Sequence, residues 1–314
     1  MNRLQKFGPL LGLIVVFTLF ALLRPKHFPR ADNLEIMMLQ TTVVGIGALG
    51  MTAVIVSGGI DLSVGSVIAL ATVVVATLLN RGWSPLSAAG GGVVAGMICG
   101  TISGLLITRL RLAPFIVTLG LWGALRGAAK GLANEQMIVA PGTWLNQLLT
   151  ALPDDRRWML VPPGVWLLAV LAVLMAAVLR YTRFGRHVFA IGSNEQTARL
   201  CGVPVERQKL FVYMLGAGLA GLAGVLQFSY LTVGDPTTAT GMELDIIAAV
   251  VIGGASLAGG EGTILGSIVG ALIMTVVSNG CTKMEFPNWV QEIVTGGIII
   301  TAVALDRFRH RRET

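Results

Sequence analysis

Charged side chains are scarce in this chain. Only 12% of its 314 residues are Asp, Glu, Lys or Arg, and 54% are hydrophobic, whereas a soluble domain carries about twice that charged fraction. Uncharged runs of about 18 residues or more recur along the sequence, and each can cross a hydrocarbon core of about 30 Å as a helix. The composition therefore predicts an all-α polytopic membrane protein, with a single transmembrane domain over residues 1–314 in a lipid bilayer.

Cysteine and histidine are also rare. Three cysteines are too few and too scattered for a disulfide framework. The three histidines, His27, His187 and His310, fall outside the apolar runs. No predicted helix therefore carries a Ser–His pair or a metal-binding histidine, and we expect no metal and no cofactor. An intramembrane enzyme is disfavoured for the same reason.

The sequence lacks a Gly-x-x-x-x-Gly-Lys-Ser/Thr phosphate loop as well. ATP hydrolysis of that kind needs the backbone amides and the lysine of such a loop to bind the phosphates. Any ATPase that acts with this protein must therefore be another chain.

Ten membrane spans are expected, with both termini in the cytoplasm. Most of the 23 lysines and arginines fall in segments that lie inside under this orientation, as the positive-inside rule requires. The net charge of +7 follows from that bias, so no nucleic-acid partner is expected. The spans are predicted at about 8–23, 36–58, 64–80, 86–107, 113–130, 163–180, 210–232, 244–258, 262–281 and 289–306.

The segment 58–66, Gly-Gly-Ile-Asp-Leu-Ser-Val-Gly-Ser, places a carboxylate between two uncharged runs, 36–60 and 62–80. An ionisable group at a membrane boundary costs free energy, so Asp61 is a functional candidate. The glycines around it let helices approach closely. Three interpretations stay open: Asp61 pairs with a neighbouring chain, it lines a solute path, or Asp61 or Ser63 caps the third span.

The longest predicted cytoplasmic loop, 180–209, contains a short helix at about 195–201. Asn194 is a good N-cap, Glu195 adds an acid that suits the helix dipole, and Gly202 supplies a stop. A short helix presented at the cytoplasmic face suits docking into the groove of a partner. It can equally lie on the lipid surface.

Five motifs lie in order from the second span to the ninth. They are 58–66, Pro114–Gly120 followed by Arg126-Gly127, the loop from Phe184 to Val203, Glu243–Gly254 with Gly259, Gly260 and Gly262, and Asn279-Gly280. Together they resemble the motifs of ribose/xylose/arabinose-type ABC sugar importer permeases. Two positions depart from that family. Residues 133–137 replace a Gly/Thr-rich turn, which concerns the docking surface or the substrate more than the mechanism, and Cys201 replaces a usual serine.

The resemblance implies the permease domain of an ATP-driven importer for a monosaccharide in a bacterial inner membrane. Its partners would be a cytoplasmic ABC ATPase dimer, a periplasmic sugar-binding protein, and a second permease copy or a sister permease. Solute would move by alternating access while the ATPase pushes on the coupling loop at about 180–209. The coupling residues that the resemblance implies are Gly185, Ala190, Gly192, Asn194, Glu195, Ala198 and Gly202.

A path for a neutral sugar needs hydroxyl and amide groups, because buried hydroxyls left unpaired cost about 1–3 kcal/mol each. A serine or threonine can instead bond to the carbonyl of its own helix, whereas the amide of Asn279, near a helix end, is expected to have a partner. The candidates are Asp61, Ser63, Thr118 and Asn279, with Ser57 and Ser256 as further hydroxyls.

Glu243 and Asp245 precede the eighth span at the predicted outer face. They are candidates for docking of the binding protein, through its basic residues. The alternative is that they only complement the dipole of the helix that follows.

A second class of function remains open, an ion-coupled secondary carrier for a small polar solute. It needs an intramembrane carboxylate that titrates, and Asp61 is the only plausible one. The missing phosphate loop agrees with this carrier and with the importer equally. The two differ in whether uptake depends on an ATPase or on an ion gradient.

Overall fold

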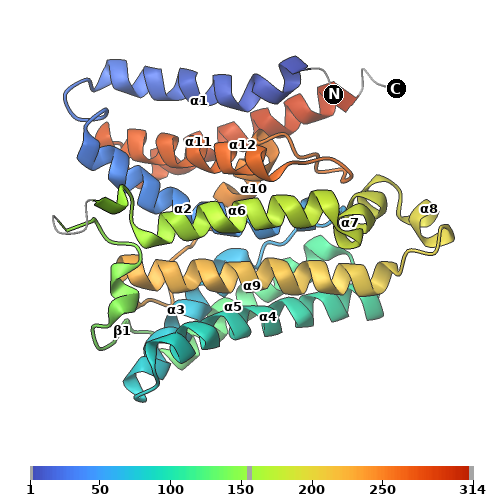
Figure 1. Cartoon of the computed structure of the whole chain (residues 1–314), viewed down its shortest axis with the longest axis horizontal. Helices are drawn as coiled ribbons and strands as arrows, with labels where there is room; N and C mark the ends of the chain where they lie inside the picture. The colour runs from blue at the N-terminus through green and yellow to red at the C-terminus, as the bar shows by residue number, and fades with distance from the viewer. Residues whose placement is uncertain (1–2, 154–157, 311–314) are drawn as a thin grey trace.

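The computed structural model describes residues 3–153 and 158–310, and the side chains of residues 8–153 and 158–304. Nearly all of its regular structure is α-helical, as predicted (Figure 1). The exceptions are the 3₁₀ turn η1 (Trp144–Gln147) and two strands, β1 (Ile138–Val139) and β2 (Val233–Gly234), which form an antiparallel pair that was not predicted. The helices are α1 (Arg3–Leu23), α2 (Ala31–Val56), α3 (Val64–Asn80), α4 (Pro85–Arg109), α5 (Pro114–Leu132), α6 (Pro163–Tyr181), α7 (Arg183–Ser193), α8 (Glu195–Leu200), α9 (Val205–Leu231), α10 (Met242–Ile252), α11 (Ile264–Lys283) and α12 (Asn288–His310).

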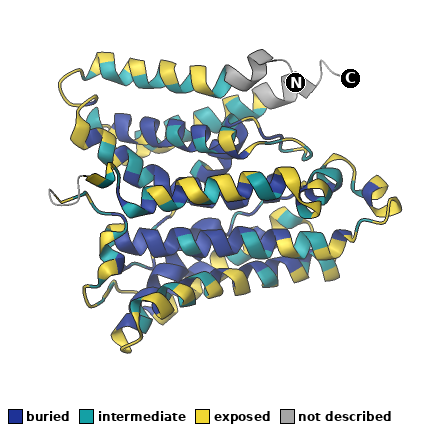
Figure 2. Ribbon diagram, in the orientation of Figure 1, coloured by how far each residue is buried: buried dark blue, intermediate teal, exposed yellow. Residues whose placement is uncertain are grey.

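Helix α2 occupies the centre of the bundle. It packs against α6, α9, α10 and α11, and every residue from Thr41 to Ser57 is buried. A helix that is apolar on all sides has no face that needs water, so other helices can surround it completely. Around it, α1 and α12 lie on one side of the bundle and α4 and α5 on the other (Figure 1). The buried residues are concentrated along α2 and on the sides of its neighbours that face it (Figure 2).

Several helices are suited to crossing a membrane. Among the described residues, α2, α4, α6, α9 and α11 are long and apolar enough to do so. Three apolar stretches are shorter, namely Gly8–Leu23 of α1, all of α3, and Asn288–Ala304 of α12. These helices support a polytopic membrane protein, whereas the count of ten spans and the cytoplasmic location of both termini stay predictions.

The predicted span 244–258 is wrong in its extent. Helix α10 has only 11 residues and ends at Ile252, so it is about 16 Å long and covers roughly half of a hydrocarbon core. Gly254 follows with φ +95°, a backbone conformation that ends a helix. The chain then runs through turns to Thr263, whose side-chain oxygen accepts a hydrogen bond from the Gly266 N–H and caps α11.

Helices α4 and α9 contact each other closely through a row of glycines. Gly92, Gly96, Gly100 and Gly104 repeat every fourth position of α4 and face α9. A Cβ on Gly96 would overlap the backbone carbonyl oxygen of Ala217. Rows of small residues allow such close helix contacts in a membrane, where dispersion forces replace the hydrophobic effect as the driving force.

Replacing Gly96 by alanine should therefore destabilise the protein, because α4 and α9 must separate. We expect the free energy of unfolding to fall by about 1–3 kcal/mol, as for other overpacked sites. Gly90→Ala on the same helix is the matched control, since a Cβ there meets nothing within 4 Å. The Gly90→Ala variant should be more stable than wild type by about 0.5–1 kcal/mol, because alanine favours the helix over glycine. Thermal unfolding of both purified variants in detergent tests this, and equal midpoints for the two would contradict it.

Candidate functional site

Asp61 lies in the short turn between α2 and α3 and is almost completely buried, with 4% exposed. Its Oδ1 accepts hydrogen bonds from the Ser63 N–H at 2.8 Å and from the Ser63 hydroxyl at 2.6 Å. Ser63 occupies the N-cap position of α3, but its side chain makes no capping bond. The carboxylate therefore stabilises its own turn, and the capping interpretation for Ser63 is wrong.

Thr118 brings α5 to this turn. Its hydroxyl lies 2.9 Å from the carbonyl oxygen of Pro114, one turn back in its own helix, and 3.2 Å from that of Ile60. Three of the four predicted path residues thus lie close together: Asp61, Ser63 and Thr118. The further candidates Ser57 and Ser256 serve local structure, through a bond from the Ser57 hydroxyl to the Val54 carbonyl and one from the Ala258 N–H to the Ser256 hydroxyl.

Asn279 does not belong to this group. Its Oδ1 accepts a hydrogen bond of 2.9 Å from the side-chain amide of Asn33, which confirms that the Asn279 amide has a partner. Asn33 stands near the start of α2 and Asp61 beyond its end, so most of α2, about 35 Å by helix geometry, lies between them.

The end of α7 packs backbone to backbone against the end of α2. Three segments meet there, and we call their contact the glycine junction: Val56 and Gly58, Gly192, and Gly259 with Gly260. The Gly260 N–H donates to the Val56 carbonyl at 2.9 Å. A Cβ on Gly192 would overlap that same carbonyl oxygen, and one on Gly259 would lie 2.8 Å from the Gly192 carbonyl oxygen. No larger residue fits at Gly192 without displacing the backbone.

Helix α7 was not predicted, because the 180–209 segment was interpreted as a loop with one short helix. The Thr182 hydroxyl oxygen accepts from the Gly185 N–H at 3.2 Å and caps the helix. Phe184, Val188 and Ile191 fall at positions i, i+4 and i+7, which is the spacing of one helix face. That pattern, after a capping threonine, was the signal that could have revealed α7.

Helix α8 begins and ends as predicted. The Asn194 Oδ1 accepts from the Thr197 N–H at 2.8 Å, which confirms the N-cap. Gly202 has φ +82°, the left-handed conformation expected where a helix stops. Ala198 is buried in a small apolar cluster with Ile191 and Val205. Helices α7, α8 and the start of α9 are therefore joined in one packed unit, with Ala190 at its edge.

Ion pairs fasten α8 to α9. Glu195 accepts from Lys209 at 2.6 Å and from Arg199 at 3.3 Å, and Arg199 also pairs with Glu206. Partial burial alone would raise the pKa of Glu195, but the hydrogen bonds and charges of Lys209 and Arg199 outweigh it and lower that pKa below its usual value.

The two predicted docking acids point inward. Glu243 is 7% exposed, and its Oε1 accepts from the Trp122 indole at 2.9 Å. The nearby guanidinium of Arg126 donates to the carbonyls of Pro236 and Thr238, at 3.1 and 2.6 Å. These groups fix the start of α10 and the preceding loop to α5. Contact with a binding protein stays a prediction for Glu243 and Asp245.

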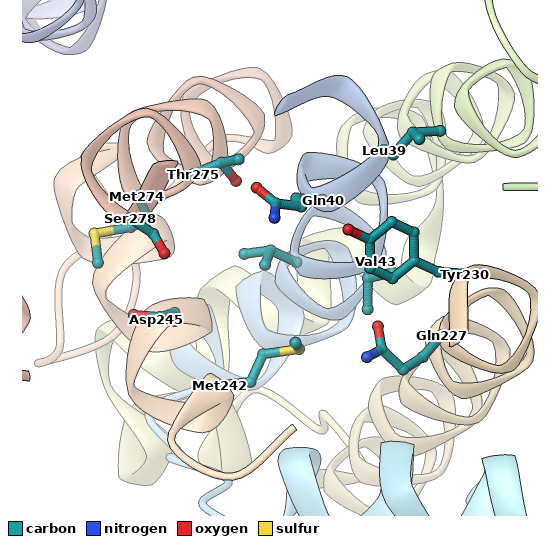
Figure 3. A pocket seen from close by; sticks show the side chains of 11 residues that line it. Leu39, Gln40, Val43, Gln227, Tyr230, Met242, Asp245, Met274, Thr275 and Ser278 are labelled. Atoms are coloured by element: carbon teal, nitrogen blue, oxygen red, sulfur yellow. The ribbon is translucent and has the colours of Figure 1, made fainter. Parts of the chain in front are cut away.

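Asp245 lines a cavity of ≈ 210 Å³ between α2, α9, α10 and α11 (Figure 3). Polar and apolar side chains share its wall. No group of three or more potential metal-binding side chains occurs among the side chains that the structure describes, those of residues 8–153 and 158–304. The lining residues are Leu39, Gln40, Val43, Val44, Gln227, Tyr230, Met242, Asp245, Met274, Thr275 and Ser278.

Residues 33–303 match the family described as the permease component of the branched-chain amino acid transport system. The chain belongs to this family of transport permeases. It is 38% identical to the ribose import permease protein RbsC of Bacillus subtilis, over 97% of this chain and 93% of the relative. It is 34% identical to the L-arabinose ABC transporter permease protein AraH of Azospirillum brasilense, over 99% of this chain and 90% of the relative. No solved structure matches the chain significantly.

The D-allose transport system permease protein AlsC of Escherichia coli is 32% identical, over 96% of this chain and 92% of the relative. These relatives cover the chain almost from end to end. The family assignment therefore rests on the whole bundle and not on one motif, and it confirms the predicted resemblance.

The ion pairs of Glu195 predict a pH response of α8. Because the pKa of Glu195 is lowered in the folded protein, its ion pairs contribute their full stabilisation above about pH 4.3, the ordinary pKa of glutamate. Their contribution is lost as the pH falls through the lower folded-state pKa of Glu195. A spin label on the exposed Cys201, next to α8, should gain mobility only at a pH below the ordinary glutamate pKa of about 4.3. In Glu195→Gln the label should be mobile already at pH 7, and equal mobility of both proteins at pH 7 would contradict this.

Proposed function

We propose that this protein is the membrane-spanning permease subunit of an ATP-driven ABC importer for a monosaccharide, in a bacterial inner membrane. The support is its membership of a transport permease family and its similarity over nearly its full length to permeases named for ribose, L-arabinose and D-allose. Its own chain performs no hydrolysis in this proposal. It is the path for solute, and the energy comes from a separate ATPase.

The glycine junction is the observation that carries the mechanism. Helices α7 and α8 form one packed unit at an end of the bundle, so a partner that binds α8 moves α7 with it. Gly192 of α7 contacts the backbone of Val56 without an intervening side chain. A displacement of α7 is therefore passed directly to the turn that holds Asp61 and to the segment 253–263, on either side of the central helix α2.

The partners follow from this arrangement. A cytoplasmic ATPase dimer would bind α7 and α8, and a second copy of the chain or a sister permease would complete the path. A periplasmic sugar-binding protein would dock at the end of the bundle opposite α8. The residues proposed to act in ATPase coupling are Gly185, Ala190, Gly192, Asn194, Glu195, Ala198 and Gly202.

Alternating access uses the same contacts. When the ATPase dimer closes, α7 would push the Asp61 turn and the 253–263 segment, and α3, α5 and α10 would follow because they attach to these segments. Asp61, Ser63 and Thr118 are then the polar groups beside the moving turn. The transport path is proposed to pass this turn on the cytoplasmic side of the bundle.

An affinity pull-down of the tagged protein from mild detergent, with its native neighbours co-expressed, tests the proposal. A soluble ATPase subunit should co-purify with the wild-type chain. Asn194→Ala should weaken this association and separate ATP hydrolysis from sugar uptake, because the missing cap costs α8 about 1 kcal/mol. Asn194→Asp is the matched control, since aspartate is an equally good N-cap.

Gly192→Ala should uncouple hydrolysis from uptake more strongly, because its Cβ forces α7 away from Val56. Gly123→Ala on α5 is its control, since a Cβ there meets nothing within 4 Å. Normal uptake by well-expressed Gly192→Ala would refute the coupling role. A chain that purifies alone and still catalyses uptake in vesicles loaded with an ion gradient would establish the secondary carrier instead.

A further inference from the structure

We infer that the cavity between α2, α9, α10 and α11 is a binding site for the sugar within the permease itself, with the Asp245 carboxylate and the Thr275 hydroxyl among its hydrogen-bonding groups. This inference rests on the proposed function and deepens it. It assigns Asp245 to the solute and not to the binding protein.

The first support is an unpaired hydroxyl that points into the cavity. Thr275 is only 4% exposed, and its Oγ1 has no hydrogen-bond partner in the part of the chain that the structure describes. Figure 3 shows this oxygen directed at the cavity, towards Gln40. A buried hydroxyl without a partner is unfavourable, so a ligand that bonds to it would recover that loss.

Other buried threonines of this bundle behave differently. The hydroxyl of Thr41 donates to the Met37 carbonyl at 2.7 Å, and that of Thr52 donates to the Ala48 carbonyl at 2.6 Å. This back-bonding is the ordinary state of a threonine inside a membrane helix. Thr275 departs from it, and its unpaired hydroxyl lies in the wall of the cavity.

The remaining polar groups of the wall are available as well. Among the described residues, the side chains of Gln40, Tyr230, Asp245 and Ser278 make no hydrogen bond. The side-chain amide nitrogen of Gln227 donates a hydrogen bond to the Thr238 hydroxyl at 2.9 Å, and the side-chain oxygen of Gln227 is left free. Carboxylate, amide and hydroxyl groups are the partners that the hydroxyls of a neutral sugar require.

The other part of the wall is apolar. Val43, Met242 and Met274 face the same space, and such side chains fit the C–H surface of a sugar ring. Pockets for drug-sized ligands measure about 300–1,000 Å³, so a cavity of ≈ 210 Å³ suits a smaller solute. The mixture of donors, acceptors and apolar surface at this size points to a monosaccharide.

Helix α10 links this cavity to the glycine junction. Met242 and Asp245 stand at its first turn, beside the cavity. Its last turn leads into segment 253–263, whose Gly260 bonds to Val56 beside Gly192. The cavity lies about midway along α2, because its lining residue Val43 is about 18 Å from Ala31 and about 20 Å from Val56 along the helix. A sugar bound in the cavity is therefore separated from the junction by the length of α10, about 16 Å.

Uptake of tritiated D-ribose, L-arabinose and D-allose by the complete importer in liposomes, with its ATPase and binding protein, tests the inference. Asp245→Asn and Thr275→Val should lower uptake of the transported sugar about tenfold to a hundredfold, as expected for the loss of a hydrogen bond at a binding site. ATP hydrolysis stimulated by the empty binding protein should stay within about twofold of wild type. Thr41→Val is the matched control, a buried threonine on α2 outside the cavity, and it should transport normally.

A protection experiment is independent of transport rates. Ser278→Cys is placed in a Cys201→Ser background, which leaves only the buried Cys99 and Cys281 as native thiols. The transported sugar, presented with the binding protein, should slow the reaction of the introduced thiol with a small maleimide several-fold. Thr282→Cys in the same background is the control, because Thr282 is exposed on α11 but does not line the cavity, and its thiol should not be protected.

The outcomes separate the two proposals. If the wild-type importer takes up one of the three sugars, but the cavity variants equal Thr41→Val and Ser278→Cys is not protected, the cavity is not the sugar site and the importer proposal stands. If wild type takes up none of the three sugars, the proposed monosaccharide function fails, and the sugar site fails with it.

Discussion

The contact of backbone with backbone at Gly192 is the constraint on which the working parts of this protein depend. Ordinary helix contacts pass through side chains, which can change rotamer and absorb small movements. Here the carbonyl of Val56 is covered by the Cα of Gly192 and bonded to the N–H of Gly260. In the proposed mechanism, helix α7, the end of α2 and the segment before α11 would therefore move together, because no side chain between them can absorb the displacement.

The same design appears at the other helix contacts. The glycine row of α4 brings its backbone onto α9, and α2 is enclosed on all sides by apolar contacts. Rigid helices with few adaptable side chains between them leave the motion to short non-helical segments. In this chain those segments are the turn at Asp61 and the residues 253–263, where four glycines have positive φ.

The sequence predicted a helical polytopic membrane protein correctly, because an uncharged run has one stable state in hydrocarbon. It predicted the cap at Asn194 and the stop at Gly202 because these depend on neighbouring residues alone. It failed where a short apolar run continues past the helix, as after Ile252, since hydropathy does not separate α10 from the turns that follow. The cavity was missed because Gln40, Tyr230 and Thr275 come from three helices and share no spacing. Asp245 was noted only for its charge.

The ion pairs of α8 have a consequence for assembly. Glu195 and Arg199 are already engaged within the chain, so α8 is ordered before any partner arrives. Binding of a partner to α8 then costs little conformational entropy, because the helix is already ordered. A disordered loop would have to become ordered on binding, and that cost would offset much of its interaction free energy. In the proposed assembly the ATPase would therefore meet a preformed helix, and most of the free energy of that encounter would remain available to move the junction behind it.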